Sequence, residues 1–145
     1  MKRIITIAVA AVFTLFWVNA CARDMIVTYD QLPQGAKTFI TTHFADSQVS
    51  YAKLDDGKYE VRMADGTELD FTRAGEWDKV DCKYTAVPAT VLALVPEGIT
   101  AYVNANFPNS VIVKVDKERF SIEVELDNDL DLVFGKKGNF IRLDD

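Results

Sequence analysis

The sequence predicts an α+β protein built from two tandem units, each a helix followed by an antiparallel meander of about four strands. Three observations support this prediction. An apolar leader precedes the rest of the chain, and the rest aligns with itself at an offset of 63 positions. Within each copy, apolar residues first recur at helical spacing and then at every second position, as in a strand. We expect the units to join into one roughly eight-stranded antiparallel sheet with the helices packed on one face.

The leader, residues 1–22, has the pattern of a secretory signal peptide. Lys2 and Arg3 precede an uncharged run that is shorter than the ~20 residues of a membrane span, although an N-terminal anchor stays an alternative. Cleavage before Arg23 is one prediction. The other is a lipoprotein signal, in which Cys21 would be lipidated. Either cut removes two cations and moves the formal net charge from −6 to −8.

The remaining chain is predicted to be a single domain, residues 23–145. It comprises a first unit (about 28–81), a connector with a short helix (82–94) and a second unit (95–145). Its acidic balance argues against nucleic acid and against adsorption to anionic membrane. No later segment is long and apolar enough to span a bilayer. Cys82 is the only cysteine beyond the leader, so we expect neither an intrachain disulfide nor a cysteine-rich metal site.

Each unit opens with a proline, which suits the first turn of a helix, followed by apolar residues at helical spacing. The matching positions are Pro33 and Pro96, Phe39 and Tyr102, Ile40 and Val103, and Phe44 and Phe107. These segments predict two amphipathic helices of similar length, one at the start of each unit.

After each helix the apolar period becomes two. In "KYEVRM" the residues Tyr59, Val61 and Met63 share one face, and "SIEVEL" repeats the pattern in the second unit. Asp65-Gly66 separates two such segments and predicts a type I′ hairpin. A strand near residues 49–54 precedes this pair, and "GEWDKV" and "GNFIRL" supply a last strand in each copy.

The doubled motifs resemble a known family. They are "LP…F…F", "YEV" or "IEV", "GEW" or "GNF", and the join "VDCKYTAVP". Over about Thr28 to Asp145 they resemble the PepSY-like, β-lactamase-inhibitor-like periplasmic proteins of Bacteroides-type bacteria. The resemblance implies an antiparallel sheet curved around helices and a periplasmic or envelope location. PepSY domains are associated with inhibition or regulation of proteases, and the resemblance supplies no catalytic residue.

Signals for catalysis are weak. His43, the only histidine, stands at the end of the first predicted helix, where we expect it to interact with the last carbonyls. No serine, cysteine or threonine lies in a nucleophile motif, and no glycine-rich phosphate loop occurs. We therefore expect a protein that is not an enzyme and has no cofactor. The acidic hairpin with Asp127, Asp129 and Asp131 is a weak calcium alternative to a solvated tip, because it lacks the loop glycine and glutamate of an EF-hand.

The polar face of the predicted sheet is the candidate binding surface, since aromatic and arginine side chains ringed by charge suit protein recognition. Its candidate residues are Tyr51, Lys53, Glu60, Arg62, Trp77, Lys114, Glu123 and Glu125. We predict a non-enzymatic exported module that binds another exported or envelope protein through this face. The alternative is an envelope sensor that binds calcium or a small ligand at acidic loops. A carboxylate hydrolase comes last, because no cleft is expected to raise the pKa of one acid.

Overall fold

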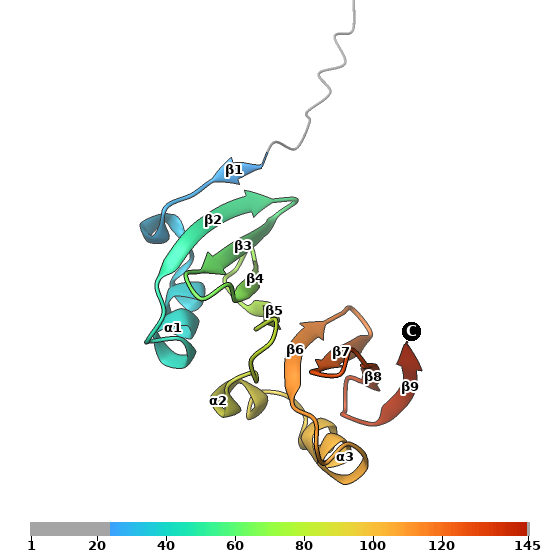
Figure 1. Cartoon of the computed structure of the whole chain (residues 1–145). Coiled ribbons are helices and arrows are strands. Elements are labelled where there is room, and N and C mark those ends of the chain that lie inside the picture. The colour runs from blue at the N-terminus through green and yellow to red at the C-terminus, as the bar shows by residue number, and fades with distance from the viewer. Residues whose placement is uncertain (1–23, 145) are drawn as a thin grey trace, which may run out of the picture.

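The computed structural model describes residues 24–144, so the predicted signal peptide and Cys21 lie outside the described residues. Within them, nine strands form one antiparallel sheet in the order β1 to β9 (Figure 1). The strands are β1 (Met25–Ile26), β2 (Val49–Asp55), β3 (Lys58–Met63), β4 (Glu68–Thr72), β5 (Trp77–Asp81), β6 (Ile112–Lys117), β7 (Ser121–Leu126), β8 (Asp131–Gly135) and β9 (Phe140–Asp144). The helices are the 3-10 helix η1 (Tyr29–Gln31) and the α-helices α1 (Gln34–His43), α2 (Ala89–Leu92) and α3 (Glu97–Asn106).

The predicted antiparallel sheet is confirmed, but it has nine strands rather than roughly eight. The additional strand is β1, in which Met25 pairs with Leu54 and Ile26 with Lys53 of β2. Two residues are too few to show a period, so the sequence pattern could not reveal this strand.

Elements recur along the chain at a fixed interval. Helix α3 begins and ends 63 residues after α1, and β8 and β9 lie at the same interval from β4 and β5. Helix α2 falls in the predicted connector. Its Thr90 Oγ1 lies 2.9 Å from His43 Nδ1, so the imidazole joins α1 to the connector. We had expected His43 to interact with the last carbonyls of α1 instead.

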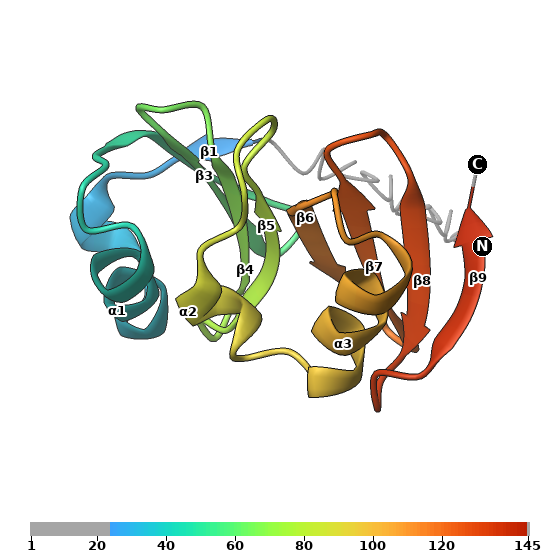
Figure 2. The ribbon, with the colours of Figure 1, turned by 60° about the horizontal axis from the view of Figure 1, so that its bottom comes forward.

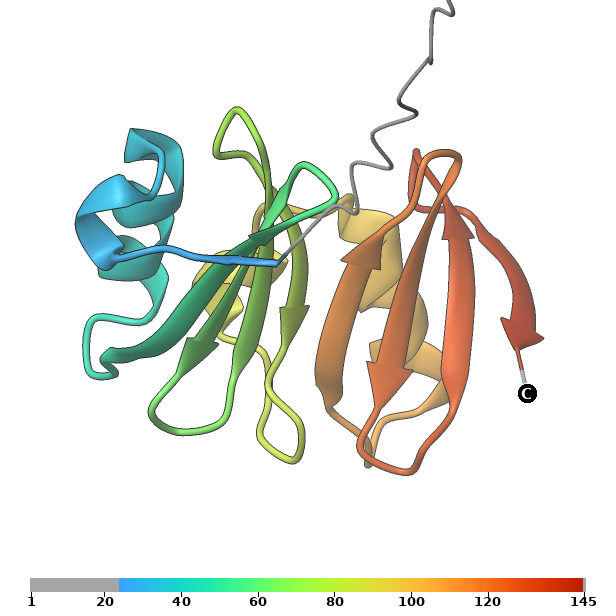
Figure 3. The same cartoon turned by 90° about the horizontal axis from the view of Figure 1, so that it is seen from above.

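The three α-helices lie on one face of the sheet (Figure 2). Buried side chains from the helices and from the inner face of both halves form a single cluster. Phe39 of α1 stacks on Trp77 with ring centroids 5.6 Å apart, and Tyr102 of α3 stacks on Phe140 at 4.3 Å. Figure 3 shows the two halves side by side, with β9 at one edge.

The type I′ hairpin is at a different place from the predicted one. Asp56 and Gly57, between β2 and β3, have φ values of 44° and 81°, the two positive values that this turn requires. At the predicted position only Gly66 has a positive φ, of 93°. There the Met63 N–H donates to the Thr67 carbonyl at 2.8 Å, which closes a three-residue loop.

Two pairs of glycines bring each long helix against a hairpin turn. A Cβ added to Gly35, in α1, would lie 2.7 Å from the carbonyl oxygen of Gly75, in the β4–β5 turn. A Cβ on Gly98, in α3, would lie 2.7 Å from the Gly138 carbonyl oxygen, in the β8–β9 turn. Only glycine permits this separation of helix and turn, because any side chain at Gly35 or Gly98 would force them apart.

A comparison of Gly75→Ala with Gly57→Ala measures the value of this contact. Both glycines have positive φ, so alanine is strained at either site by about 1–2 kcal/mol. A Cβ at Gly75 would also lie 2.7 Å from Pro33 Cβ, whereas nothing lies within 4 Å at Gly57. We expect Gly75→Ala to lower the free energy of unfolding by about 1–3 kcal/mol more than Gly57→Ala, measured by urea denaturation. Equal losses would show that the contact contributes nothing.

Candidate functional site

The sheet face opposite the helices, called the outer face here, carries two rows of side chains that cross from β2 to β9. The cross-strand register defines them. One row is Lys53, Glu60, Asp70, Lys79, Asp116, Glu123, Val133 and Arg142, and the other is Tyr51, Arg62, Glu68, Asp81, Lys114, Glu125, Asp131 and Asp144. The rows hold nine carboxylates against five cations, so the outer face is acidic.

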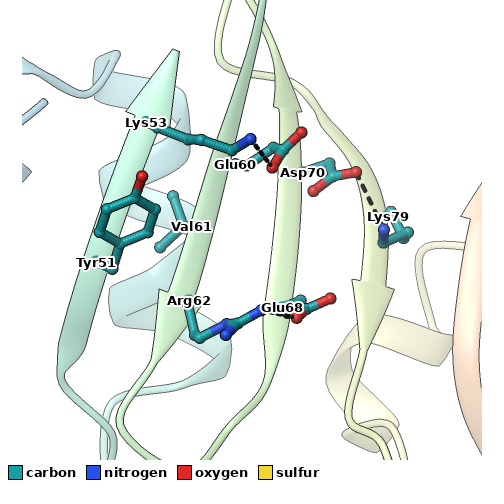
Figure 4. Close-up of a pocket in the computed structure, with 8 residues that line it drawn as sticks. All are labelled: Tyr51, Lys53, Glu60, Val61, Arg62, Glu68, Asp70 and Lys79. Carbon is teal, nitrogen blue, oxygen red and sulfur yellow. Dashed lines mark hydrogen bonds and ion pairs between the residues drawn. The ribbon is translucent and has the colours of Figure 1, made fainter. Parts of the chain in front are cut away.

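A hollow of about 490 Å³ lies on the outer face of the first half (Figure 4). In this view the helices lie behind the strands, so the hollow opens away from them. Tyr51, which is 41% exposed, stands at one side of the hollow. Its lining residues are Tyr51, Lys53, Glu60, Val61, Arg62, Glu68, Asp70 and Lys79.

Cross-strand ion pairs hold the charged side chains of the hollow in place. Lys53 Nζ lies 3.0 Å from Glu60 Oε2, 3.1 Å from Asp55 Oδ2 and 3.2 Å from Asp24 Oδ2. The hydrogen bond to Glu60 and those to the two aspartates raise the pKa of Lys53 well above its ordinary value. A single lysine therefore joins β2, β3 and the segment before β1 on this face.

A second ion-pair group, around Glu68, lies at the end of the hollow away from Lys53 (Figure 4). Glu68 accepts hydrogen bonds from Lys83 Nζ, at 2.9 Å, and from Arg62. The Lys83 hydrogen bond, together with Arg62, keeps the pKa of Glu68 below its ordinary value. Lys83 also lies 2.7 Å from Asp81, so one lysine holds the acids of β4 and β5 together.

Two acids flank Lys79 at the seam, which is the pairing of β5, the last strand of the first half of the sheet, with β6, the first strand of the second half. Asp70 lies 3.3 Å from the Lys79 ammonium, and Asp116 of β6 is the cross-strand neighbour of Lys79. Burial raises the pKa of both carboxyl groups above their ordinary value. Our expectation that no cleft raises the pKa of an acid on this face was therefore wrong, since Asp70 also lines the hollow.

The eight predicted binding residues divide into three groups. Tyr51, Lys53, Glu60 and Arg62 meet in the hollow. Lys114, Glu123 and Glu125 form a separate cluster on the second half, with Lys114 Nζ at 3.7 Å from Glu123 and 3.6 Å from Glu125. Strand alternation also predicts that Glu68 and Asp70 lie on this face, although neither is among the eight, and both line the hollow. The sequence pattern missed Lys79, which lines it as well.

Trp77, the eighth residue, does not lie on the outer face as predicted. Strict alternation would place Trp77 and Val80 on opposite faces, because three positions separate them. The register shifts between Asp70 and Phe71, so that Phe71 pairs with Trp77 and the intervening Asp78 is bulged. The bulge turns both Trp77 and Val80 to the inner face, where Trp77 packs against Phe39.

Metal and thiol chemistry find little support in residues 24–144. No group of three or more His, Cys, Asp or Glu side chains in this range is placed to hold a metal ion. Asp127 Oδ1 accepts the Val111 N–H at 3.1 Å, and Asp129 occupies a turn position with φ of 62°. Burial raises the pKa of the Cys82 thiol to about 11, which makes it a poor nucleophile. No helix in the described range is long and apolar enough to cross a membrane.

Comparison with protein families identifies the class of this chain. The model described as "Putative beta-lactamase-inhibitor-like, PepSY-like" matches residues 16–61 and 57–142. These two segments cover most of the sequence, so the chain belongs to this family. The resemblance seen in the sequence motifs is confirmed. No curated protein matches the chain.

Three solved structures share the fold. A "putative calcium-regulated periplasmic protein" from Bacteroides thetaiotaomicron is 36% identical, with a TM-score of 0.77 over 84% of this chain and 97% of that one. A "putative periplasmic protein of unknown function" from Bacteroides vulgatus is 34% identical, with a TM-score of 0.79 over 85% and 100%. A second putative periplasmic protein from Bacteroides vulgatus is 37% identical, with a TM-score of 0.77 over 86% and 99%.

The raised pKa of Asp116 predicts a pH-dependent stability. Its ordinary value is 3.8, and burial raises it in the folded chain, which therefore holds this proton more tightly than the unfolded chain does. Linkage makes the free energy of unfolding fall as the pH rises from the ordinary value through the folded-state pKa. Asp116→Asn cannot ionise, so we expect it to be more stable than the wild type near about pH 7, with the difference vanishing toward about pH 4.

Urea denaturation across this pH range measures the effect. Asp46→Asn, which removes an exposed carboxylate from the loop after α1, is the matched control for the change in net charge. A variant of Asp116 that is less stable than the wild type at neutral pH would contradict the prediction. It would mean that attraction to Lys79 outweighs the cost of burying the carboxylate.

Proposed function

We propose that this chain is a non-enzymatic periplasmic binding module that recognises another exported protein through its outer face. One observation carries the proposal. Within residues 24–144 the helices cover only the inner face, and the outer face keeps a hollow of about 490 Å³ beside the exposed Tyr51. Uncovered sheet faces with aromatic and arginine anchors suit protein recognition. The inhibitor-like description of the family and the periplasmic description of the three neighbours agree with it.

The charge of the outer face favours a partner with a basic surface. Carboxylates outnumber cations on it, and an acidic surface attracts a basic partner and raises the rate of association. Salt should therefore slow association without abolishing it. In the first half the cations are already paired, so Tyr51 and the walls of the hollow would supply the contact area.

A hydrolase is the weaker interpretation. Asp70 has the raised pKa that a general acid needs, but it is paired with Lys79 at 3.3 Å. Its neighbours in the hollow, Glu60 and Glu68, are bound by Lys53, and by Lys83 and Arg62, respectively. These ion pairs engage the carboxylates that would have to act on a substrate.

We also infer that the two halves are copies of one helix-plus-meander unit whose outer faces have diverged. Elements recur 63 residues apart, and the same glycine contact recurs in both halves. On the outer face, however, Lys114 stands at the position of Tyr51 and Glu125 at that of Arg62. Because the aromatic anchor occurs in the first copy alone, we assign the partner contact to the first half.

Two substitutions test the proposal. Tyr51→Ala and Arg62→Ala remove the exposed aromatic and guanidinium groups of the hollow, and each should weaken binding on the order of thirtyfold if these residues are anchors. The partner is first captured from an envelope extract on immobilised residues 23–145. It is then purified, and its affinity for each variant is measured by calorimetry.

The chain supplies matched controls for both substitutions. Tyr84→Ala removes an exposed tyrosine from the loop before α2, and Arg73→Ala removes an exposed arginine from the β4–β5 turn. Both should bind as the wild type does, and all four variants should retain its melting temperature. Equal affinities of Tyr51→Ala and Tyr84→Ala would exclude the hollow as the binding site.

Calcium binding is a second candidate function, favoured by the description of the Bacteroides thetaiotaomicron neighbour as calcium-regulated. Within residues 24–144, the Asp131 Oδ1 atom is buried without a hydrogen-bond partner. Glu125 is its cross-strand neighbour on the outer face. A cation held by these carboxylates would compensate the buried oxygen.

A calcium titration separates this candidate from the first. If the acids bind calcium, the melting temperature should rise in proportion to the logarithm of added calcium, and Asp131→Asn should remove the rise. Asp46→Asn serves again as the control with the same change in charge. A melting temperature that does not respond to calcium would exclude this function, whatever the outcome for the outer face.

A further inference from the structure

We propose that β9 is a homodimerisation edge, which pairs antiparallel with β9 of a second copy of this chain to continue the sheet across both molecules. The sheet order leaves two edge strands, β1 and β9. Exposed edges carry unpaired backbone groups that can accept another strand. The sequence of β9 is suited to itself as a partner, as the internal seam between the halves shows.

The seam joins two copies of one tripeptide. Residues 79–81 of β5 and 114–116 of β6 both read Lys-Val-Asp. They pair antiparallel, with each lysine opposite the aspartate of the other strand and the two valines opposite each other. An order of cation, aliphatic residue and acid is therefore self-complementary in an antiparallel pair, since opposite charges meet on both sides of the apolar centre.

Strand β9 carries the same order. Residues 142–144 read Arg-Leu-Asp and lie 63 positions after Lys-Val-Asp of β5. Pairing with β8 places Arg142 beside Val133 and Asp144 beside Asp131, on the outer face, with Leu143 on the inner face. When Leu143 faces Leu143 of the second copy, each Arg142 meets the partner molecule's Asp144. This arrangement is a closed two-fold dimer and cannot extend into a filament.

The inner-face leucine of β9 is exposed, unlike the equivalent valine of β5. Val80 of β5 lies opposite Val115 of the neighbouring strand and is 0% exposed, whereas Leu143 at the equivalent position is 50% exposed. The bulged Ile141 beside it is also 50% exposed. The opposite edge strand, β1, has two residues against the five of β9, so it offers fewer backbone groups to a second copy, although its Met25 and Ile26 are 60% and 72% exposed. A second β9 would cover Leu143 as β6 covers Val80.

Sedimentation equilibrium on residues 23–145 tests the dimer, together with charge-reversed variants. Arg142→Asp gives two acids on β9, and Asp144→Arg gives two cations, so each variant repels its own copy. We expect the wild type to dimerise and each variant to dissociate at least about tenfold more readily. An equimolar mixture of the two variants should form a heterodimer, and the double variant Arg142→Asp/Asp144→Arg should dimerise again. Lys137→Asp, in the exposed β8–β9 turn, is the control and should dimerise as the wild type does.

Each other outcome overturns the proposal. A wild type that stays monomeric up to about 1 mM has no such interface. Single variants that dimerise like the wild type place the interface elsewhere. Monomeric single variants without rescue in the mixture or in the double variant exclude the antiparallel register centred on Leu143. Melting temperatures of all variants, compared with that of Lys137→Asp, separate loss of pairing from loss of folding.

Discussion

The contact between glycine backbones at Gly35 and Gly75, and again at Gly98 and Gly138, sets the distance between each long helix and its half of the sheet. At that distance the aromatic ring of the helix reaches the last strand of the meander, so that Phe39 stacks on Trp77. A larger separation would leave a gap in the core, where each lost contact weakens packing. The arrangement of the inner face therefore follows from two positions at which no side chain fits.

The bulges in β5 and β9 complete this arrangement and determine what remains outside. In each last strand one extra residue brings an aromatic ring and an aliphatic side chain to the same inner face. The rings therefore do not contribute to the outer face, whose two rows hold charged side chains, Tyr51 and Val133. One bulge in each of these two strands therefore places the stacked pairs in the core and leaves the candidate site polar.

Much of this fold can be predicted from the sequence, because the spacing of apolar residues indicates the helices and strands, and proline and glycine mark where they begin and end. Pro33, Pro96 and the change of period locate the helices and the longer strands. Bulges, the two-residue β1 and the hollow leave no comparable signal. A bulge changes the facing of Trp77 without changing its neighbours in sequence, and the hollow depends on pairings between distant strands. For this reason the acidic face and the place of Asp70 on it were predictable, whereas the ion pair between Asp70 and Lys79 was not.

The outer face also fixes the register of the sheet, because a slip of one residue would move its charges into the core. Its ion pairs are unevenly distributed, however. Lys53 binds three acids in the first half, whereas at the seam Lys79 lies 3.3 Å from Asp70 and is the cross-strand neighbour of Asp116. Burial raises the pKa of both seam acids, since neither is fully compensated. The two acids whose pKa burial raises therefore lie at the centre of the outer face, where the two halves meet, whereas Lys53, whose pKa is raised by its three acidic partners, lies in β2 near the β1 edge.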